Sequence, residues 1–240
     1  MKRVISFIII FLFLIFFINA EEFKIGSGAG YKKPLLKILK IYNSENPKVK
    51  IDPIFGNLEM VITQSKQTSD LALIVGDKGY FKNTTLEFSR NIPLGQGIMV
   101  LAFSKGKKIL KFDEILNADI KRIGIPDMKN AIYGIAGKQY LKSLNYFDRV
   151  EGKLMQVKTV PQVVSYLIAE ELDAGFINLT EAIAMKDKLG GWINLEQSNY
   201  EEIEIVCAVI NGFENNKMVR RFIVFLETQK VKGVLKEYGL

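Results

Sequence analysis

A glycine-rich stretch at residues 25–39 reads IGSGAGYKKPLLKIL, and it places Gly26, Gly28 and Gly30 directly before a helical pattern. A turn of this kind between a strand and a helix can hold an anion, because free backbone N–H groups and the helix dipole point to one spot. The spacing is not that of a dinucleotide loop, since the third glycine comes one residue early, and the GK[ST] ending of a P-loop is missing. The stretch therefore indicates a site for another anion, or only a tight turn.

Four later loops have the same order, in which a strand-like run is followed by small or polar residues and a helical pattern. Gly56 and Asn57 lie in FGN, Tyr133 lies in PDMKNAIYG, the third loop reads TVP, and Asn178 ends the run DAGFIN. Because ligands lie at the carboxyl ends of parallel strands, we expect these loops to face one cleft. Neutral donors and helix N-termini suit a small oxyanion. The alternative for Asn57 is a helix cap, and for Asn178 a structural role.

Catalytic chemistry has few candidates in this chain. It has no histidine, and its single cysteine, Cys207, lies in the apolar run IVCAVI. Ser-His and Cys-His catalysis, most zinc sites and a disulfide within the chain are thereby excluded. Asp70 and Asp173 each begin a strand, far from the carboxyl ends. We expect a protein that is not an enzyme, has no cofactor and offers no ligands to a metal cation.

Strand-like and helix-like stretches alternate along the chain, with the candidate loops between them. A βαβαβ order fills the first part of the chain, and the pattern then restarts, which predicts two α/β lobes with mostly parallel sheets. Two long strands, near residues 98–103 and 203–210, are expected at the seams. We expect lobe I to comprise residues 21–94 and 206–240, and lobe II to comprise residues 95–205.

The first twenty residues have the layout of a secretory signal peptide. MKR is followed by a near-apolar run of 15 residues and by Ala20, which precedes two glutamates. The run is shorter than the roughly 20 residues that a spanning helix needs. We expect cleavage after Ala20 and a periplasmic protein; the alternative is an uncleaved anchor. Loss of Lys2 and Arg3 would lower the net charge from +7 to +5, and the spread of basic residues indicates no nucleic-acid binding.

Over residues 23–240 the chain resembles the periplasmic molybdate/tungstate-binding proteins of ABC transporters. The resemblance rests on pieces in a fixed order. These are IGSGAGYKKPLLKILKIY, FGN before the second helix, TSDLALI, GIPDMKNAIYGIAGKQYLKSL, VPQVVSYLIAEELDAGFIN and the closing KEYG. The resemblance implies a two-lobed periplasmic binding protein, with each lobe a mostly parallel sheet flanked by helices and two hinge strands joining the lobes.

The resemblance also implies which residues face the ligand. Gly30 stands where the family has a serine, with Ser27 as the nearest hydroxyl, and Asn57 takes the place of a second serine. Ala131 in PDMKNAIYG and Val160 in TVP match two further ligand positions of the family, and Asn178 stands where the family has a tyrosine. The candidate ligand-binding residues are Ser27, Gly28, Ala29, Gly30, Gly56, Asn57, Ala131, Tyr133, Val160 and Asn178.

The predicted function is capture of a molybdate- or tungstate-like oxyanion between the lobes and its delivery to an ABC permease in the inner membrane. The only metal expected is the Mo or W of the bound oxyanion, and the protein is expected to be a monomer. One alternative keeps this fold and binds a different anion or a small organic acid. Another is an exported enzyme or a membrane-anchored sensor on the same scaffold.

Overall fold

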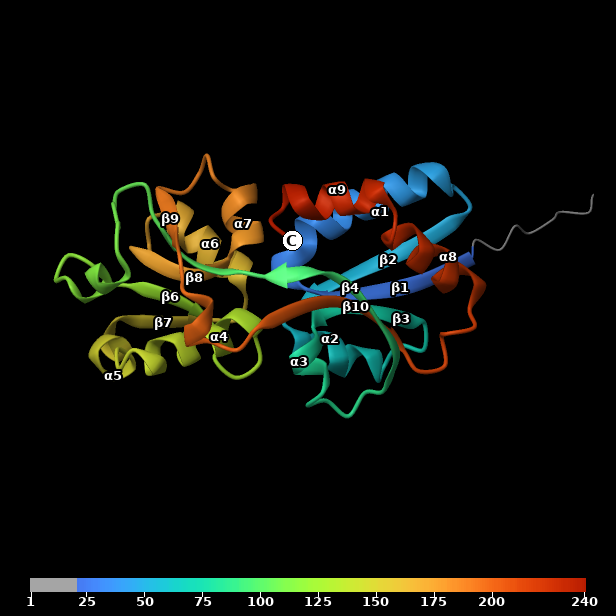
Figure 1. Cartoon of the computed structure of the whole chain (residues 1–240), viewed down its shortest axis with the longest axis horizontal. Helices are drawn as coiled ribbons and strands as arrows, with labels where there is room; N and C mark the ends of the chain where they lie inside the picture. Colours follow the sequence, from blue (N-terminus) through green and yellow to red (C-terminus); the bar gives the residue numbers. More distant parts are fainter. Residues whose placement is uncertain (1–20) are drawn as a thin grey trace, which may run out of the picture.

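The computed structural model describes residues 21–240, which form two five-stranded sheets side by side (Figure 1). In order across the sheet, lobe I contains β2 (Val49–Gly56), β1 (Glu21–Gly28), β3 (Leu71–Asp77), β10 (Ile203–Ile210) and β4 (Phe88–Gly97). Lobe II contains β7 (Leu154–Val157), β6 (Ile123–Pro126), β8 (Ala174–Asn178), β5 (Met99–Phe103) and β9 (Gly191–Asn194). The predicted signal peptide, residues 1–20, lies outside the described residues.

The two sheets share one pattern of strand directions. In lobe I, β1 is parallel to β2 and β3, and β10 runs antiparallel to both β3 and β4. In lobe II, β6 is parallel to β7 and β8, and β5 runs antiparallel to both β8 and β9. One strand of each sheet therefore opposes the other four, which confirms the expectation of two mostly parallel sheets.

Helices cover both faces of each sheet (Figure 1). In lobe I they are α1 (Lys32–Glu45), α2 (Leu58–Ser65), α3 (Lys78–Phe81), α8 (Lys217–Leu226) and α9 (Gln229–Glu237). In lobe II they are α4 (Ile132–Ser143), α5 (Phe147–Val150), α6 (Val160–Ile168) and α7 (Leu179–Ala184). Short 3-10 turns are η1 (Ala29–Tyr31), η2 (Phe112–Leu116), η3 (Glu151–Lys153) and η4 (Gln197–Asn199). Within residues 21–240, no helix combines the length and the apolar character needed to cross a membrane.

Some elements differ from those predicted. The strands expected near residues 98–103 and 203–210 are confirmed as β5 and β10. Strand β4 has no counterpart in the sequence analysis, because Pro93 and mostly exposed positions obscure its alternation; proline is tolerated at a sheet edge. Asn178, for which the sequence left a structural role open, caps α7, since its side chain accepts the Glu181 N–H.

The chain crosses between the sheets twice. The first crossing is at Ile98, between β4 and β5, and the second is the segment from β9 to β10, residues 195–202. Tyr200 joins the two crossings, since its hydroxyl accepts the Met99 N–H at 3.1 Å. Because β10 starts opposite Gly97 at Ile203, both crossings enter lobe I at neighbouring positions. The lobe boundaries at residues 94/95 and 205/206 stay a proposal.

The central strands are buried on both faces, as their continuous apolar runs predict. Every residue of β5 and β8 is buried, and so are six of the seven residues of β3. Cys207 in β10 is fully buried, and burial raises the pKa of its thiol to about 12. The cysteine therefore packs as a small apolar side chain in this sheet.

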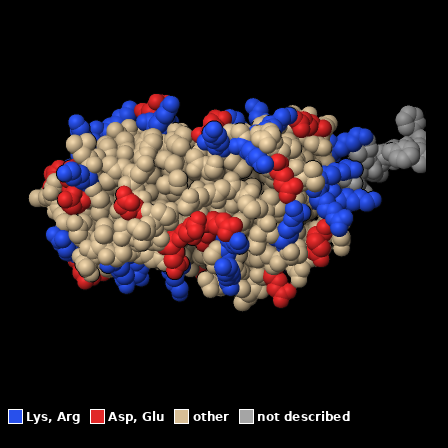
Figure 2. Space-filling view, in the orientation of Figure 1, with Lys and Arg blue, Asp and Glu red and all other residues tan. Residues whose placement is uncertain are grey.

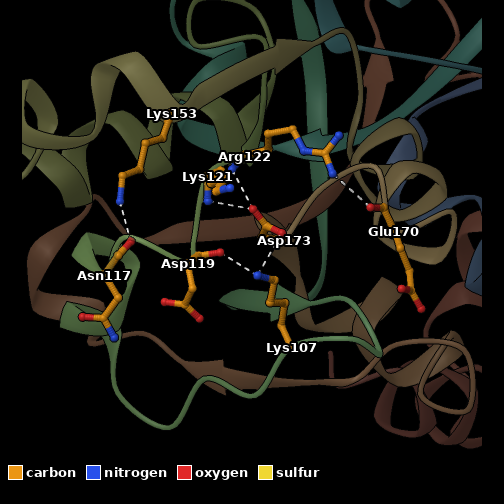
Figure 3. A network of polar contacts seen from close by, with 8 residues as sticks. All are labelled: Lys107, Asn117, Asp119, Lys121, Arg122, Lys153, Glu170 and Asp173. Atoms are coloured by element: carbon orange, nitrogen blue, oxygen red, sulfur yellow. Dashed lines mark hydrogen bonds and ion pairs between the residues drawn. The ribbon is translucent and has the colours of Figure 1, made fainter.

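A buried carboxylate organises the outer end of lobe II (Figure 3). Asp173, just before β8, accepts the backbone N–H groups of Lys121 and Arg122 at 2.7 and 2.8 Å, and Lys107 approaches it at 3.4 Å. Burial opposes ionisation, but these donors hold the pKa of Asp173 below its ordinary value. The Lys153 ammonium donates to the carbonyls of Ile115, Leu116 and Asn117, which end the η2 turn.

We predict that Asp173→Ala lowers the free energy of unfolding by about 2–4 kcal/mol at pH 7, because two buried N–H groups lose a charged acceptor. Asp173→Asn keeps an oxygen there and should cost less. Because the folded pKa is depressed, this stability is present above the unfolded pKa of about 3.9 and is lost as the pH falls through the folded pKa. Urea titrations at pH 7 and pH 3 measure the difference. Equal stabilities of Asp173→Ala and wild type at pH 7 would contradict the assignment.

Candidate functional site

A small cavity, called the cleft cavity below, lies between the lobes at the carboxyl ends of the first strands. Its volume is about 30 Å³, which is enough for a water molecule. Lobe I supplies Gly28, Ala29, Gly30, Tyr31, Gly56, Asn57 and Leu58, and lobe II supplies Ala131, Ile132, Tyr133, Thr159 and Val160. The first turns of η1, α2, α4 and α6 all contribute to this lining.

The first loop turns from β1 into η1 and α1 and presents backbone donors. The first N–H groups of a helical segment have no partner within it, which makes those of Ala29, Gly30 and Tyr31 candidate donors to a ligand. The carbonyls of the same loop are already paired. Gly28 O accepts the Ser27 hydroxyl at 3.1 Å, Ala29 O accepts the Lys32 N–H, and Gly30 O accepts the side-chain amide of Asn178. The loop therefore offers hydrogen-bond donors to a ligand, because its carbonyl oxygens already accept hydrogen bonds within the protein.

Asn57 has the capping role that the sequence left open, and its position keeps the ligand-binding role a proposal. Its side-chain oxygen accepts the Met60 N–H at 2.9 Å and caps α2. An amide that caps through its oxygen keeps its nitrogen as a donor, and Asn57 lines the cleft cavity. The helix N-terminus and this side chain can thus act on the same ligand.

Lobe II offers donors from α4 and α6. The Ala131 N–H donates to Asp127 O at 3.0 Å, so the open donors of α4 start at Ile132 and Tyr133. At α6 the Val160 N–H is available, while Pro161 has none. The Thr159 hydroxyl stands at the same helix start and lines the cavity. Ala131 therefore lies at the predicted place but uses its own N–H inside the protein.

Two tyrosines from opposite lobes meet at the cleft cavity. The hydroxyls of Tyr31 and Tyr133 are 2.5 Å apart, and both side chains are buried. Burial raises the pKa of both phenols well above the ordinary value, so both stay protonated at neutral pH. One hydrogen bond joins the two hydroxyls, and the Tyr31 hydroxyl also has a hydrogen bond with the side chain of Asn178.

The structure brings most of the predicted residues together. Gly28, Ala29, Gly30, Gly56, Asn57, Ala131, Tyr133 and Val160 line the cleft cavity. Sequence reasoning missed Tyr31, Leu58, Ile132 and Thr159 as lining residues. The position of Thr159 just before a proline-containing helix start, and that of Tyr31 just after the glycines, were the available signals.

Ser27 and Asn178 lie outside this lining. Ser27 is fully buried within β1, and its hydroxyl turns back to Gly28 O. Asn178 is also fully buried, and it donates to Gly30 O at 2.9 Å while its oxygen accepts the Glu181 N–H. Ser27 does not reach the cleft cavity because its side chain is buried within β1. Asn178 does not reach it because its side chain is bonded to Gly30 O in the other lobe.

Charged groups surround the cleft cavity without lining it. The ammonium of Lys32 lies 5.5 Å from the centre of the Phe55 ring, and Lys33 pairs with Glu181. Burial raises the pKa of Glu181, although Lys33 opposes this. Figure 2 shows Lys and Arg on both lobes, interspersed with Asp and Glu. Any anion in the cleft cavity would be held by neutral donors and dipoles.

A family model described as bacterial extracellular solute-binding protein matches residues 23–240. YvgL of Bacillus subtilis (strain 168), named as an ABC transporter substrate-binding lipoprotein, is 22% identical over 226 residues, which cover 90% of this chain and 84% of the relative. The molybdate-binding protein ModA of Haemophilus influenzae (strain ATCC 51907 / DSM 11121 / KW20 / Rd) is 19% identical over 233 residues, which cover 93% and 91%.

Among solved structures, the periplasmic molybdate-binding protein of Azotobacter vinelandii has the same fold. Its TM-score is 0.80 at 17% identity, and the match covers 90% of this chain and 97% of that chain. The expected two-lobed fold is thereby confirmed. The expectation that the chain is not an enzyme is also confirmed, because the family model and the matched proteins are all described as binding proteins.

We predict that Lys33→Met destabilises the protein more than Glu181→Gln. Removal of Lys33 leaves a buried carboxylate unpaired, at a cost of about 1–2 kcal/mol at pH 7 after allowance for the exposure of Lys33. Because the folded pKa of Glu181 is raised, the neutral form is favoured below the unfolded value, and this advantage is lost as the pH rises through the folded pKa. Neutral glutamine should therefore cost little. Thermal melts at pH 7 decide the order, and a larger loss for Glu181→Gln would refute it.

Proposed function

The chain belongs to the family of bacterial extracellular solute-binding proteins, and we propose that its solute is a small oxyanion of the molybdate and tungstate kind. The anion would bind in the cleft cavity and pass to an ABC permease. The observation that carries the proposal is the convergence of four helical N-termini from both lobes on one small cavity. Helix N-termini favour negative charge through their free N–H groups and their dipoles.

The balance of donors and acceptors favours an anion that carries no proton. None of the residues that line the cleft cavity is Asp or Glu. The carbonyls of the first loop already accept hydrogen bonds, and so does the side-chain oxygen of Asn57. Molybdate, tungstate and sulfate need only donors, whereas hydrogen phosphate also brings an O–H that needs an acceptor. We therefore propose that the site discriminates against phosphate.

The choice of molybdate or tungstate over sulfate has separate support. The Haemophilus relative and the Azotobacter structure are both named as molybdate-binding proteins. Discrimination among these anions would depend on their size, because all three offer four oxygens and no proton.

The cellular setting of the proposal follows from the family. We propose that the protein acts outside the cytoplasm, in the periplasm, after export directed by residues 1–20. Its partners would be the oxyanion and the permease of an ABC transporter, which the protein would meet as a monomer. Closure of the lobes around the ligand would take place at Ile98 and at residues 195–202, where the chain crosses between the sheets.

Calorimetric titration of residues 21–240 with molybdate, tungstate, sulfate and phosphate tests the proposal directly. We expect molybdate and tungstate to bind and to raise the melting temperature, with phosphate the weakest of the four. If none binds and none changes the melting temperature, the oxyanion proposal fails. Native mass spectrometry of freshly purified protein would then reveal a retained organic acid or another anion.

Two neighbouring glycines give a matched pair of variants. A Cβ at Gly28 would meet Tyr31, Ile132 and Leu58 at 3.7–3.9 Å, which is ordinary contact inside the cleft cavity. Gly28→Ala should therefore lower tungstate affinity at least tenfold and leave the melting temperature of the free protein unchanged. A Cβ at Gly26 would overlap Val61 of α2, so Gly26→Ala should instead destabilise the fold by about 1–3 kcal/mol. Unchanged tungstate affinity in Gly28→Ala would place the site elsewhere.

A further inference from the structure

Asn178 joins the two lobes beside the cleft cavity. It ends β8 in lobe II, and its side-chain nitrogen donates to Gly30 O in lobe I at 2.9 Å. Its side-chain oxygen accepts the Glu181 N–H at 3.3 Å and caps α7. Both halves of the amide are thus used, one within lobe II and one across the cleft. The residue is fully buried, so this contact is formed without competition from water.

A second contact joins the two lobes three residues further along both segments. Lys33 lies three residues after Gly30, and Glu181 lies three residues after Asn178; these two side chains form an ion pair. The first turn of α1 therefore runs beside the first turn of α7, with matched contacts one turn apart. The alignment fixes the position of the first loop relative to lobe II.

Gly30 leaves the space that this contact needs. A Cβ built on Gly30 would stand 3.0 Å from the side-chain nitrogen of Asn178 and 3.3 Å from its carbonyl carbon and oxygen. These separations are closer than ordinary van der Waals contact, and the neighbour is a buried amide held at both ends. A side chain at residue 30 and an asparagine at residue 178 therefore compete for one space.

We propose that Asn178 is a positioning residue that sets anion affinity by holding the first loop closed across the lobes, a role that rests on the proposed oxyanion site. By accepting from Asn178, the Gly30 carbonyl is directed to lobe II rather than to the ligand. A carbonyl dipole facing an anion would repel it, whereas the N–H groups of the same loop attract it. Asn178 thus acts through Gly30 and does not itself touch the anion.

The magnitude expected from this contact is moderate and measurable. A buried neutral hydrogen bond that forms only in the closed state contributes about a factor of ten to binding. The same bond favours closure of the free protein, so the ligand meets a loop that is already in place. Loss of the bond should weaken every oxyanion by a similar factor, because it acts on the loop and not on one kind of anion.

Asn178→Ser is the main test, since serine also caps helices but is too short to reach Gly30 O. The matched control is Asn216→Ser in α8, where asparagine caps a helix in lobe I through Met218 and Val219. With tungstate as the probe, we expect Asn178→Ser to bind about tenfold more weakly and Asn216→Ser to bind as wild type does. Equal affinities of wild type and Asn178→Ser would overturn the proposal.

A double-mutant cycle tests the competition for space. Gly30→Ala should weaken tungstate binding in the wild-type background, because its Cβ would lie 3.0–3.3 Å from the side-chain amide of Asn178 and crowd it. In the Asn178→Ser background, the same Gly30→Ala change should have little further effect. Losses that simply multiply in the double variant would show that the two residues are not coupled and would overturn the proposal.

The cycle also separates this inference from the proposed function. If wild-type protein binds none of the four oxyanions, the proposed function fails, and the same four proteins are compared by thermal unfolding instead. Gly30→Ala should then lower the melting temperature more in the wild-type background than in the Asn178→Ser background. Additive shifts in melting temperature would refute the contact between the lobes as well.

Discussion

In both lobes helices begin where parallel strands end, and this geometry controls where the backbone N–H groups point. Parallel strands feed helices at one edge of each sheet, so the free N–H groups of several helices point to that edge. The two sheets face each other across this edge, and the cleft cavity lies between them. An anion site can therefore be built with no charged side chain in its lining.

Each of the three glycines of the first loop leaves space for a different part of the structure. Gly26 lets α2 lie against β1, Gly28 keeps the cleft cavity open, and Gly30 leaves room for Asn178. None of the three has a positive φ angle, so the reason in each case is space rather than backbone conformation. A single motif in the sequence thus serves the packing of lobe I, the volume of the site and the contact between the lobes.

Side chains that could have bound a ligand directly are used to orient the backbone. Ser27 bonds to Gly28 O, Asn57 caps α2, and Asn178 bonds to Gly30 O while it caps α7. These contacts use oxygen atoms that would otherwise accept hydrogen bonds and leave N–H donors for a ligand. An anion without a proton needs only such donors. Tyr31 and Tyr133 add neutral hydroxyls from opposite lobes.

The sequence alone predicts the alternating elements, the two-lobed class and the loops that meet at the cleft, because apolar periodicity and helix starts are local properties. It could not decide whether Asn57 caps or donates, or that Ala131 uses its N–H on Asp127, because these depend on which acceptors come within reach after folding. It also missed the edge strand β4, whose exposed face carries little pattern. Only the tertiary structure brought Asn178 onto Gly30, because a contact between residues 148 positions apart exists only when both lobes are folded and face each other.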